Sequence, residues 1–349
     1  MTPMRSRSAS ETPSPQAHYQ DALWVGPAIV LRILRDLDLQ GLVDIPKVVE
    51  RIEAGYRADA RGDVVPFPRS RFDARGVFLA WQGAAIPSED LLGYRSYAYN
   101  AEGYDRGEQV VALYGYSAMD VRAVFVGRLV GNLRTGAALA AALHLAEPGV
   151  RELGLIGTGD QARNALACIG ATSRLSRMLA WSPSPTRREE FCAWAERALG
   201  LRVELGQDAS EVIRCVPAIV LVTSAESTVV TPEMVAEPKL LLSISAYRRP
   251  EIDVRLLDSA NRIWTDSVAQ ASGPGCLFEP DARRAKLRPL SEGILDGSIH
   301  DRTSTRIIIN TGAAWEELVL AEMMYELAES RDVGLSVAMP KERPGAAVF

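Results

Sequence analysis

Histidine and cysteine are scarce, with three and four of them among 349 residues. The cysteines form no CxxC pair and the histidines have no ligand spacing, so the sequence offers no metal site. We expect free thiols in a reducing compartment. The residues concerned are Cys168, Cys192, Cys215, Cys276, His18, His144 and His300.

Long apolar runs and excess positive charge are also lacking. No stretch approaches the roughly 20 apolar residues that cross a bilayer, and no apolar segment follows Arg5 and Arg7 as a secretory signal requires. The net charge of −5 argues against nucleic acid as the main ligand, since phosphate binding needs a basic face. We therefore expect a cytoplasmic protein that binds neither membrane nor nucleic acid.

The composition is that of a folded protein large enough for two domains, with 47% hydrophobic and 24% charged residues. Residues 1–18 are rich in Ser, Thr and Pro, which predicts a disordered tail, and residues 339–349 predict a flexible one. A helix is predicted after Asp44, an N-cap residue followed by Pro46. Strand-like segments at 77–81, 109–116 and 121–126 then predict a mostly antiparallel sheet.

The pattern changes near Arg134, where an Ala/Leu-rich helix is predicted over 135–146. Strands at 152–157, 177–181 and 201–205 alternate with helices at 161–169 and 187–199. The runs 218–223 and 240–245 are continuously apolar, as in parallel strands that helices cover on both faces. The sequence thus predicts an α/β fold with a Rossmann-type doubly wound parallel sheet, closed by a helix over 315–330.

A Gly-rich turn follows the first of these strands. Gly157, Gly159 and Ala162 form a Gly-x-Gly-x-x-Ala pattern between a strand and a helix, with a second strand about 20 residues later, as in dinucleotide-binding folds. The first Gly permits the tight turn, the second lets the backbone approach a pyrophosphate, and the small third residue lets helix and strand pack closely. A pyrophosphate there would lie at the positive end of the helix dipole. We expect Gly157, Thr158, Gly159, Asp160, Gln161 and Ala162 to bind a nicotinamide dinucleotide.

The end of the second strand selects between NAD and NADP. An Asp or Glu there would bind the ribose 2′-hydroxyl of NAD, but the segment 181–188 has no acid. It offers Ser182, Ser184 and Arg187 instead, with Arg188 as a further cation. This favours NADP slightly over NAD. The alternative is that both arginines are solvated residues of the next helix.

Two further segments carry a family resemblance. Gly131–Ala137, with its Arg-Thr-Gly-Ala run, lies before the Gly-rich turn, and Thr311–Glu317 opens the last helix. Together with Ile156–Ala162, this order resembles the ornithine cyclodeaminase/mu-crystallin family over most of the chain. Residues 243–253 more loosely resemble a branch that makes N-(2-amino-2-carboxyethyl)-glutamate.

The resemblance implies a two-domain architecture and a homodimer. Residues 19–133 and 316–338 would form an α+β domain for substrate binding and dimerisation, and residues 134–315 the NAD(P)-binding domain. Members transfer hydride at the C–N carbon of a small amino or imino acid. The resemblance also implies that Thr135, Thr311 and Gly312 bind the cofactor, and we expect Thr223 and Ser224, after an apolar strand, to do so too.

In this family two arginines bind the substrate carboxylate. Arg69, with Arg71 as the competing choice, and Arg134 match them, since a guanidinium can grip a carboxylate with two parallel hydrogen bonds. Arg95 stands where the family has its catalytic lysine. An arginine effectively cannot lose its proton, so Arg95 could bind a carboxylate or stabilise negative charge but could not shuttle protons. We name Arg69, Arg95 and Arg134 as substrate-binding residues and the last two as catalytic.

Other family features are missing. Gly131 replaces a threonine, Glu317 replaces a common Asp, and the stretch 243–249 has no acid where cyclodeaminases place an Asp. These departures weaken cyclodeamination most, because it needs a base, ring closure and hydride return. Simple hydride transfer asks less of the protein. The proton source stays open among Tyr94, Tyr97, Tyr99 and a bound water.

The sequence therefore favours an NAD(P)-dependent oxidoreductase acting on the C–N bond of a small amino or imino acid. The first alternative is an ornithine or lysine cyclodeaminase, which would release ammonia without net change in the cofactor. The second is a protein that binds the cofactor without catalysis.

Overall fold

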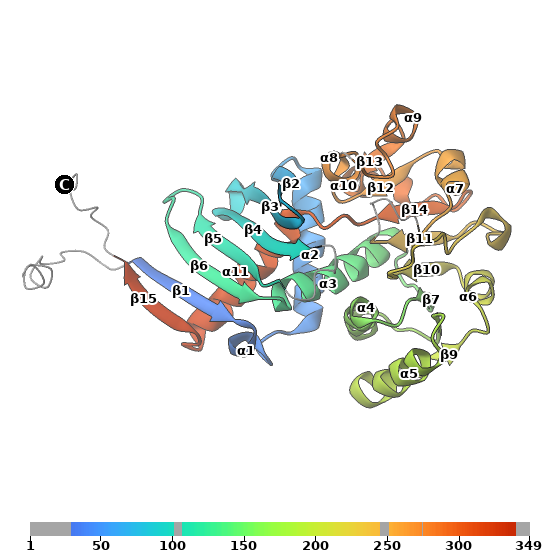
Figure 1. The fold of residues 1–349 in the computed structure, drawn as a ribbon, viewed down its shortest axis with the longest axis horizontal. Helices are drawn as coiled ribbons and strands as arrows, with labels where there is room; N and C mark the ends of the chain where they lie inside the picture. Colours follow the sequence, from blue (N-terminus) through green and yellow to red (C-terminus); the bar gives the residue numbers. More distant parts are fainter. Residues whose placement is uncertain (1–28, 101–106, 245–250, 274, 340–349) are drawn as a thin grey trace, which may run out of the picture.

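The computed structural model describes residues 29–100, 107–244, 251–273 and 275–339. Two sheets lie at opposite ends of the molecule, with three long helices between them (Figure 1). These helices are α2 (Ile45–Ala60), α3 (Leu129–Ala146) and α11 (Ala314–Ser330). The two predicted tails lie outside the described residues, apart from Met339, which ends the last strand.

The first sheet has seven strands in the order β15-β1-β6-β5-β4-β3-β2. All neighbours are antiparallel except β1 and β6, so the sheet is mixed. The strands are β1 (Ile29–Arg35), β2 (Val65–Ala74), β3 (Val77–Ile86), β4 (Leu91–Asn100), β5 (Gln109–Gly115), β6 (Val121–Gly127) and β15 (Leu335–Met339); the short helices α1 (Asp36–Leu39) and η2 (Pro87–Glu89) connect them.

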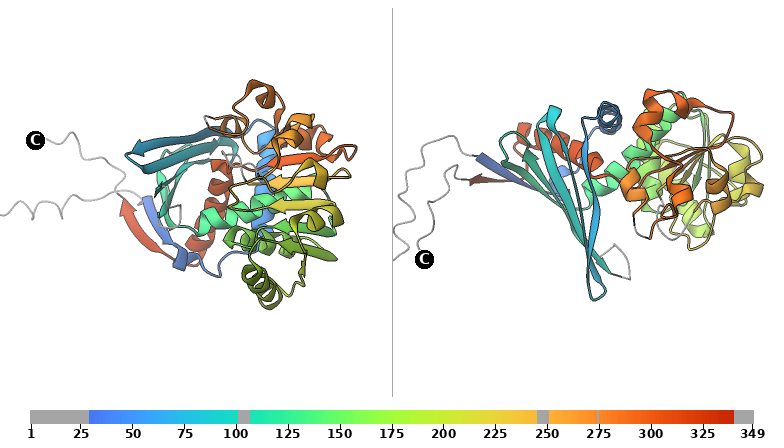
Figure 2. Two further views of the ribbon diagram at one scale, coloured as in Figure 1. Left: turned by 45° about the vertical axis from the view of Figure 1, so that its right-hand side comes forward. Right: turned by 90° about the horizontal axis from the view of Figure 1, so that it is seen from above.

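Helices cover one face of this sheet (Figure 2). Alternation along β4 turns Arg95 and Tyr97 inward, where both are buried, whereas Tyr94 points to the other face and is 39% exposed. Helix α11 is buried on most of its circumference, including Glu316 and Glu317. The inward residues of β3, β4 and β5 and the first turns of α11 therefore lie in the middle of the molecule.

The second sheet has eight strands, all parallel, in the order β13-β12-β14-β11-β10-β7-β8-β9. The spatial order β9-β8-β7-β10-β11-β14 within it is that of a Rossmann fold. The strands are β7 (Glu152–Ile156), β8 (Arg177–Trp181), β9 (Glu204–Leu205), β10 (Ala218–Leu221), β11 (Leu240–Ser243), β12 (Ile263–Thr265), β13 (Leu287–Pro289) and β14 (Arg306–Ile309). Every residue of β10 and β11 is buried, as expected of strands that helices cover on both faces.

Short connections and helices complete this domain. The α-helices are α4 (Asp160–Thr172), α5 (Pro185–Leu199), α6 (Ala209–Cys215), α7 (Val254–Ser259), α8 (Val268–Ala271), α9 (Asp281–Arg284) and α10 (Leu290–Leu295), and the 3-10 turns are η3 (Pro232–Met234) and η4 (Ser298–His300). The predicted α/β class, with a doubly wound parallel sheet beside an α+β part, is confirmed.

Details differ from the sequence-based expectations. Helix α3 begins six residues before 135 and runs unbroken through positions 133 and 134. The predicted domain boundary between these two residues therefore falls inside one helix. The strand predicted over 201–205 is only two residues long. Asp44 precedes α2 as expected, but its side chain makes no capping hydrogen bond.

Candidate functional site

A cavity of about 950 Å³ lies along the carboxyl ends of β7, β8 and β10. This is the edge of a parallel sheet at which open α/β folds bind their ligands, and the volume is that of a small-molecule or cofactor site. Ten of the residues expected to bind the cofactor line it: Gly157, Thr158, Gly159, Asp160, Gln161, Ser182, Ser184, Arg187, Thr223 and Ser224.

The Gly-rich turn has the geometry of a pyrophosphate cradle. Gly157 has φ +111°, and a Cβ there would come closer than 3.0 Å to the Val222 carbonyl oxygen, so a side chain is excluded twice over. A Cβ on Gly159, the N-cap of α4, would meet no atom within 4 Å and would instead occupy open space. Ala162 is fully buried and does not reach the cavity wall. The turn therefore fits a dinucleotide phosphate at the N-terminus of α4.

Beyond the end of β8, the cavity wall presents hydroxyl groups and the cation of Arg187. The hydroxyls of Thr158 and Ser182 lie 2.8 Å apart, and Ser184 caps α5 by accepting a hydrogen bond from the Arg187 backbone. Arg188 does not line the cavity, and its Nη1 donates to the Gly206 carbonyl oxygen. Asp208, which caps α6, is part of the wall.

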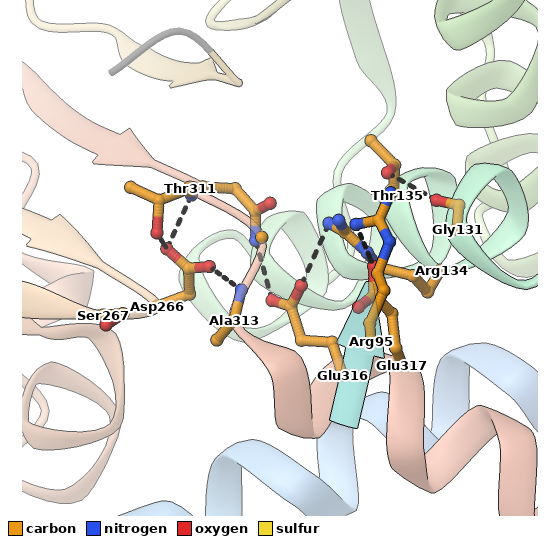
Figure 3. A network of polar contacts seen from close by, with 12 residues as sticks. Arg95, Gly131, Arg134, Thr135, Asp266, Ser267, Thr311, Ala313, Glu316 and Glu317 are labelled. Atoms are coloured by element: carbon orange, nitrogen blue, oxygen red, sulfur yellow. Dashed lines mark hydrogen bonds and ion pairs between the residues drawn. The ribbon is translucent and has the colours of Figure 1, made fainter. Parts of the chain in front are cut away.

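Three of the expected cofactor residues lie away from this wall. The Thr135 hydroxyl donates to the Gly131 carbonyl oxygen one turn back in α3. Thr311 and Gly312 form the loop between β14 and α11, in which Gly312 has φ +80°. The sequence had not indicated the residue that holds this loop, Asp266: its carboxylate accepts from the Thr311 and Ala313 backbone and from the Thr311 hydroxyl, at 2.6–2.8 Å (Figure 3).

The carbonyl groups of this loop face side chains from both parts of the molecule. Arg69 on β2 donates to the carbonyl oxygens of residues 311 and 312 through Nη2, and to the Gln82 side chain through Nε. Gln82 and Gln270 also donate to these carbonyls. Arg69 is therefore the arginine of its segment that lies in this network, whereas Arg71 is exposed.

Arg95 and Arg134 converge on one carboxylate. Oε1 of Glu317 accepts from Nη1 of Arg95 at 2.5 Å and from Nε of Arg134 at 2.7 Å (Figure 3). All three side chains are at least nine-tenths buried. Arg95 also donates to Gln109 at 2.9 Å and lies over the ring of Tyr97 at 4.4 Å.

The pKa values of the adjacent Glu316 and Glu317 are shifted in opposite directions. Burial would raise the pKa of Glu317, but Arg134 and Arg95 outweigh it and lower that pKa, so the group is ionised. Burial and the neighbouring Asp266 raise the pKa of Glu316 to about 8, against the effect of Arg134. Oε1 of Glu316 accepts from Asn310 at 2.8 Å and from the Tyr56 hydroxyl at 3.0 Å.

The cluster around Glu317 therefore holds more positive than negative charge at neutral pH. Arg69, Arg95 and Arg134 are cations, Glu317 is the ionised carboxylate between two of them, and Glu316 keeps its proton. Asp266 is compensated by the backbone N–H groups it accepts from. Such a cluster can stabilise an anionic ligand.

Helix α3 carries residues of both the cavity wall and this cluster. Asn132 lines the cavity and accepts from Gln161 of the Gly-rich turn at 3.2 Å, and Arg134 lies two residues further along the helix. A Cβ on Gly312 would lie 2.6 Å from both terminal nitrogens of Arg134, so only glycine lets that guanidinium approach the loop. Arg128, at the start of α3, also lines the cavity.

Of the three tyrosines considered as proton donors, Tyr94 does not face the arginine cluster. It lies on the face of β4 opposite to Arg95, because successive side chains of a strand alternate. Tyr97 lies with the arginines, and Tyr99 packs against it at 5.9 Å between ring centres. Residues 245–249 of the stretch without an acid lie outside the described residues.

Sequence reasoning missed Gln82, Gln109, Asp266, Gln270 and Glu316. Glu316 lies within the segment Thr311–Glu317 that carries the family resemblance, whereas the other four belong to no recognisable motif. The buried position of these polar residues in the folded chain reveals them. Within the ranges that the structure covers, no group of three or more His, Cys, Asp or Glu side chains could hold a metal. In the same ranges, no helix has the length and apolarity to cross a membrane.

Comparison with known proteins gives consistent results. Iminosuccinate reductase from Paracoccus denitrificans is 26% identical over 87% of this chain and 99% of its own. Its crystal structure with NAD+ superposes with a TM-score of 0.78 at 25% identity, covering 89% of this chain and 100% of that one. An alanine dehydrogenase from Archaeoglobus fulgidus is 26% identical over 87% of this chain and 97% of its own.

A more distant structure shares the fold. Thermococcus litoralis Δ1-pyrroline-2-carboxylate reductase, solved with NADH and L-proline, has a TM-score of 0.77 at 20% identity and covers 88% of this chain and 100% of that one. Residues 32–332 match the family model described as "Ornithine cyclodeaminase/mu-crystallin family". The match covers the parallel sheet, most of the first sheet, the Gly-rich turn and the arginine cluster, and the chain therefore belongs to the ornithine cyclodeaminase/mu-crystallin family.

Proposed function

We propose that this protein is an NAD(P)-dependent oxidoreductase that reduces the C=N bond of a small imino acid. The observation that carries the proposal is that one helix, α3, carries Asn132 in the wall of the cavity beside the Gly-rich turn and Arg134 in the cationic cluster with Arg69 and Arg95. The similar iminosuccinate and pyrroline-2-carboxylate reductases support the reaction class.

Each part of the site has a role in such a reaction. Gly157 makes the tight turn, Gly159 lets the backbone approach the pyrophosphate, and Arg69 and Arg134 bind and orient the substrate carboxylate. A nicotinamide bound there supplies the hydride. Arg95 stabilises negative charge and holds no transferable proton.

The missing lysine bears on the alternatives. A cyclodeaminase needs a base beside the substrate, and a guanidinium cannot be one. A reductase needs one proton on nitrogen, which an imine that is already protonated brings with it. The ring of Tyr97 lies against the Arg95 guanidinium. The residues therefore favour reduction over cyclodeamination.

The test measures loss of reduced nicotinamide absorbance with NADH and NADPH over a panel of imino acids. The panel holds a ring imine with one carboxylate, pyrroline-2-carboxylate, and an open imine with two, iminosuccinate formed from oxaloacetate and ammonia. We expect turnover with at least one of them, and none from Gly159→Trp, which fills the cradle, provided that its circular dichroism matches the wild type.

Two results would contradict the proposal. Release of ammonia from ornithine or lysine without net change in the cofactor would identify a cyclodeaminase. Tight NADH and NADPH binding with no turnover on any substrate would favour a protein that binds the cofactor without catalysis.

We further propose a preference for NADP. Ser182, Ser184 and Arg187 in the wall could donate hydrogen bonds to a 2′-phosphate. The nearby carboxylate of Asp208 already accepts a hydrogen bond from the Glu211 backbone at 2.7 Å. Arg187→Ala should weaken NADPH about tenfold and leave NADH unchanged, since a charge-assisted hydrogen bond contributes about 1.5–3 kcal/mol. Arg188→Ala is the matched control, because Arg188 does not line the cavity. Tighter binding of NADH than NADPH by the wild type would contradict this preference.

We also propose that the protein is a homodimer through the uncovered face of the first sheet. Phe72, Leu79 and Trp81 are 63%, 46% and 44% exposed there and lie side by side on β2 and β3. Apolar patches of this kind mark interfaces. Light scattering should report a dimer for the wild type and a monomer for Trp81→Glu, with Leu295→Glu, an exposed apolar position on α10, as the control. A wild-type monomer would refute the homodimer.

A further inference from the structure

The Arg95 guanidinium is fixed from three directions. Nη1 donates to Glu317, Nη2 donates to Oε1 of Gln109, and the ring of Tyr97 lies against its face. A lysine has one terminal nitrogen and could not make the first two contacts with separate atoms. The contacts around position 95 therefore suit a guanidinium group better than the ammonium group of a lysine.

Gly131 provides the room for this arrangement. A Cβ there would come closer than 3.0 Å to Oε1 of Gln109 and would lie 3.2 Å from Nη2 of Arg95. Gly131 lies within the first turn of α3 and has no positive φ, so its backbone conformation would suit any residue. The space above it, and not its flexibility, explains why a glycine stands here.

We propose that Gly131 and Gln109 are positioning residues that admit and orient an arginine at position 95, so that the active site carries a permanent cation there. The absence of a side chain at 131 and the guanidinium at 95 are then coupled, because the space above Gly131 holds the Gln109 side chain, which accepts from Arg95. The catalytic part of this inference rests on the proposed reductase function.

The first experiment places a methyl group in the space between Gly131 and the Gln109 side chain. Gly131→Ala should raise the KM for the imino acid at least about tenfold and leave the Kd for NADH within about twofold, because it displaces Gln109 and Arg95 but not the Gly-rich turn. The matched control is Gly170→Ala in α4, where a Cβ would likewise press on a side chain, that of Leu201. That variant should lose stability without a change in KM. An unchanged KM for Gly131→Ala would overturn the proposal.

The second experiment is a double-mutant cycle between Gly131→Thr and Arg95→Lys. Each single variant should lower kcat/KM, and the double variant should be at least about tenfold more active than the product of the two losses predicts. Without the Arg95 guanidinium that holds it, Gln109, the side chain closest to position 131, can turn away from the threonine. The pH profile of Arg95→Lys should gain an ionisation that the wild type lacks, since lysine can lose its proton. Additive losses would overturn the coupling.

The same cycle in urea unfolding needs no substrate. Coupling between positions 131 and 95 in the free energy of unfolding would support the steric part even if no imino acid were turned over, and additivity there would overturn it. Failure of the reductase assay with preserved coupling would thus contradict the proposed function alone.

Discussion

Removing the charge of Glu317 should destabilise the protein severely. Glu317→Gln keeps the size of the side chain but leaves Arg95 and Arg134 adjacent to each other without their shared carboxylate. Two unit charges about 4 Å apart interact by about 4 kcal/mol at an effective dielectric constant of 20. Breaking a buried pair by removing one partner costs about 3–5 kcal/mol, so we expect a loss in this range.

Urea unfolding followed by tryptophan fluorescence measures this loss, since the buried Trp315 lies two residues before Glu317. The control is Glu204→Gln, whose pair with Arg177 is exposed, and its midpoint should not move. The lowered pKa of Glu317 means that its contribution is present above the ordinary pKa of 4.5 and is lost as the pH falls through the lowered value. A loss below about 1 kcal/mol at neutral pH would refute the view that Glu317 is the ionised centre of the cluster.

Three further outcomes are expected. Glu316→Gln should stabilise the protein at pH 7 by up to about 3 kcal/mol, because the folded wild type must take up a proton that the unfolded chain lacks there, whereas an amide needs none. Between pH 4.5 and 8 the wild type should lose about 1.4 kcal/mol per pH unit through Glu316, since only the folded state binds that proton, and urea titrations should show that this slope is absent from the variant. Asp266→Asn should cost about 1–3 kcal/mol in urea unfolding, because an amide cannot accept all the hydrogen bonds from the Thr311 loop. Gly157→Ala should lose more than about 1 kcal/mol and NADH binding, as its φ is positive and the Val222 carbonyl occupies the Cβ position; unaltered NADH binding in a titration would contradict this.

The sequence predicted those parts of the fold that depend on local pattern. The Gly-rich turn and the apolar strands β10 and β11 have signals that neighbouring residues alone produce, namely small residues at a sharp turn and unbroken apolar runs. Arg95 and Arg134 were identified by family resemblance, and the structure brings both to Glu317.

The rest depends on contacts between distant segments. Asp266 meets Thr311, and Gln109 meets Gly131, only because two sheets and α3 bring them together. Tyr94 was considered beside Arg95 because a list of neighbouring residues does not show which face of the strand each one takes. Strand register settles that question in the folded chain.

The most direct test of the proposed reaction follows the hydride itself. The protein is incubated with an imino acid that it turns over and a reduced cofactor carrying deuterium at the transferable position, and the product is analysed by mass spectrometry. One deuterium on the α-carbon, with one cofactor oxidised per product, is the predicted result. Product without deuterium, or an amino acid converted while the cofactor stays reduced, would contradict the account.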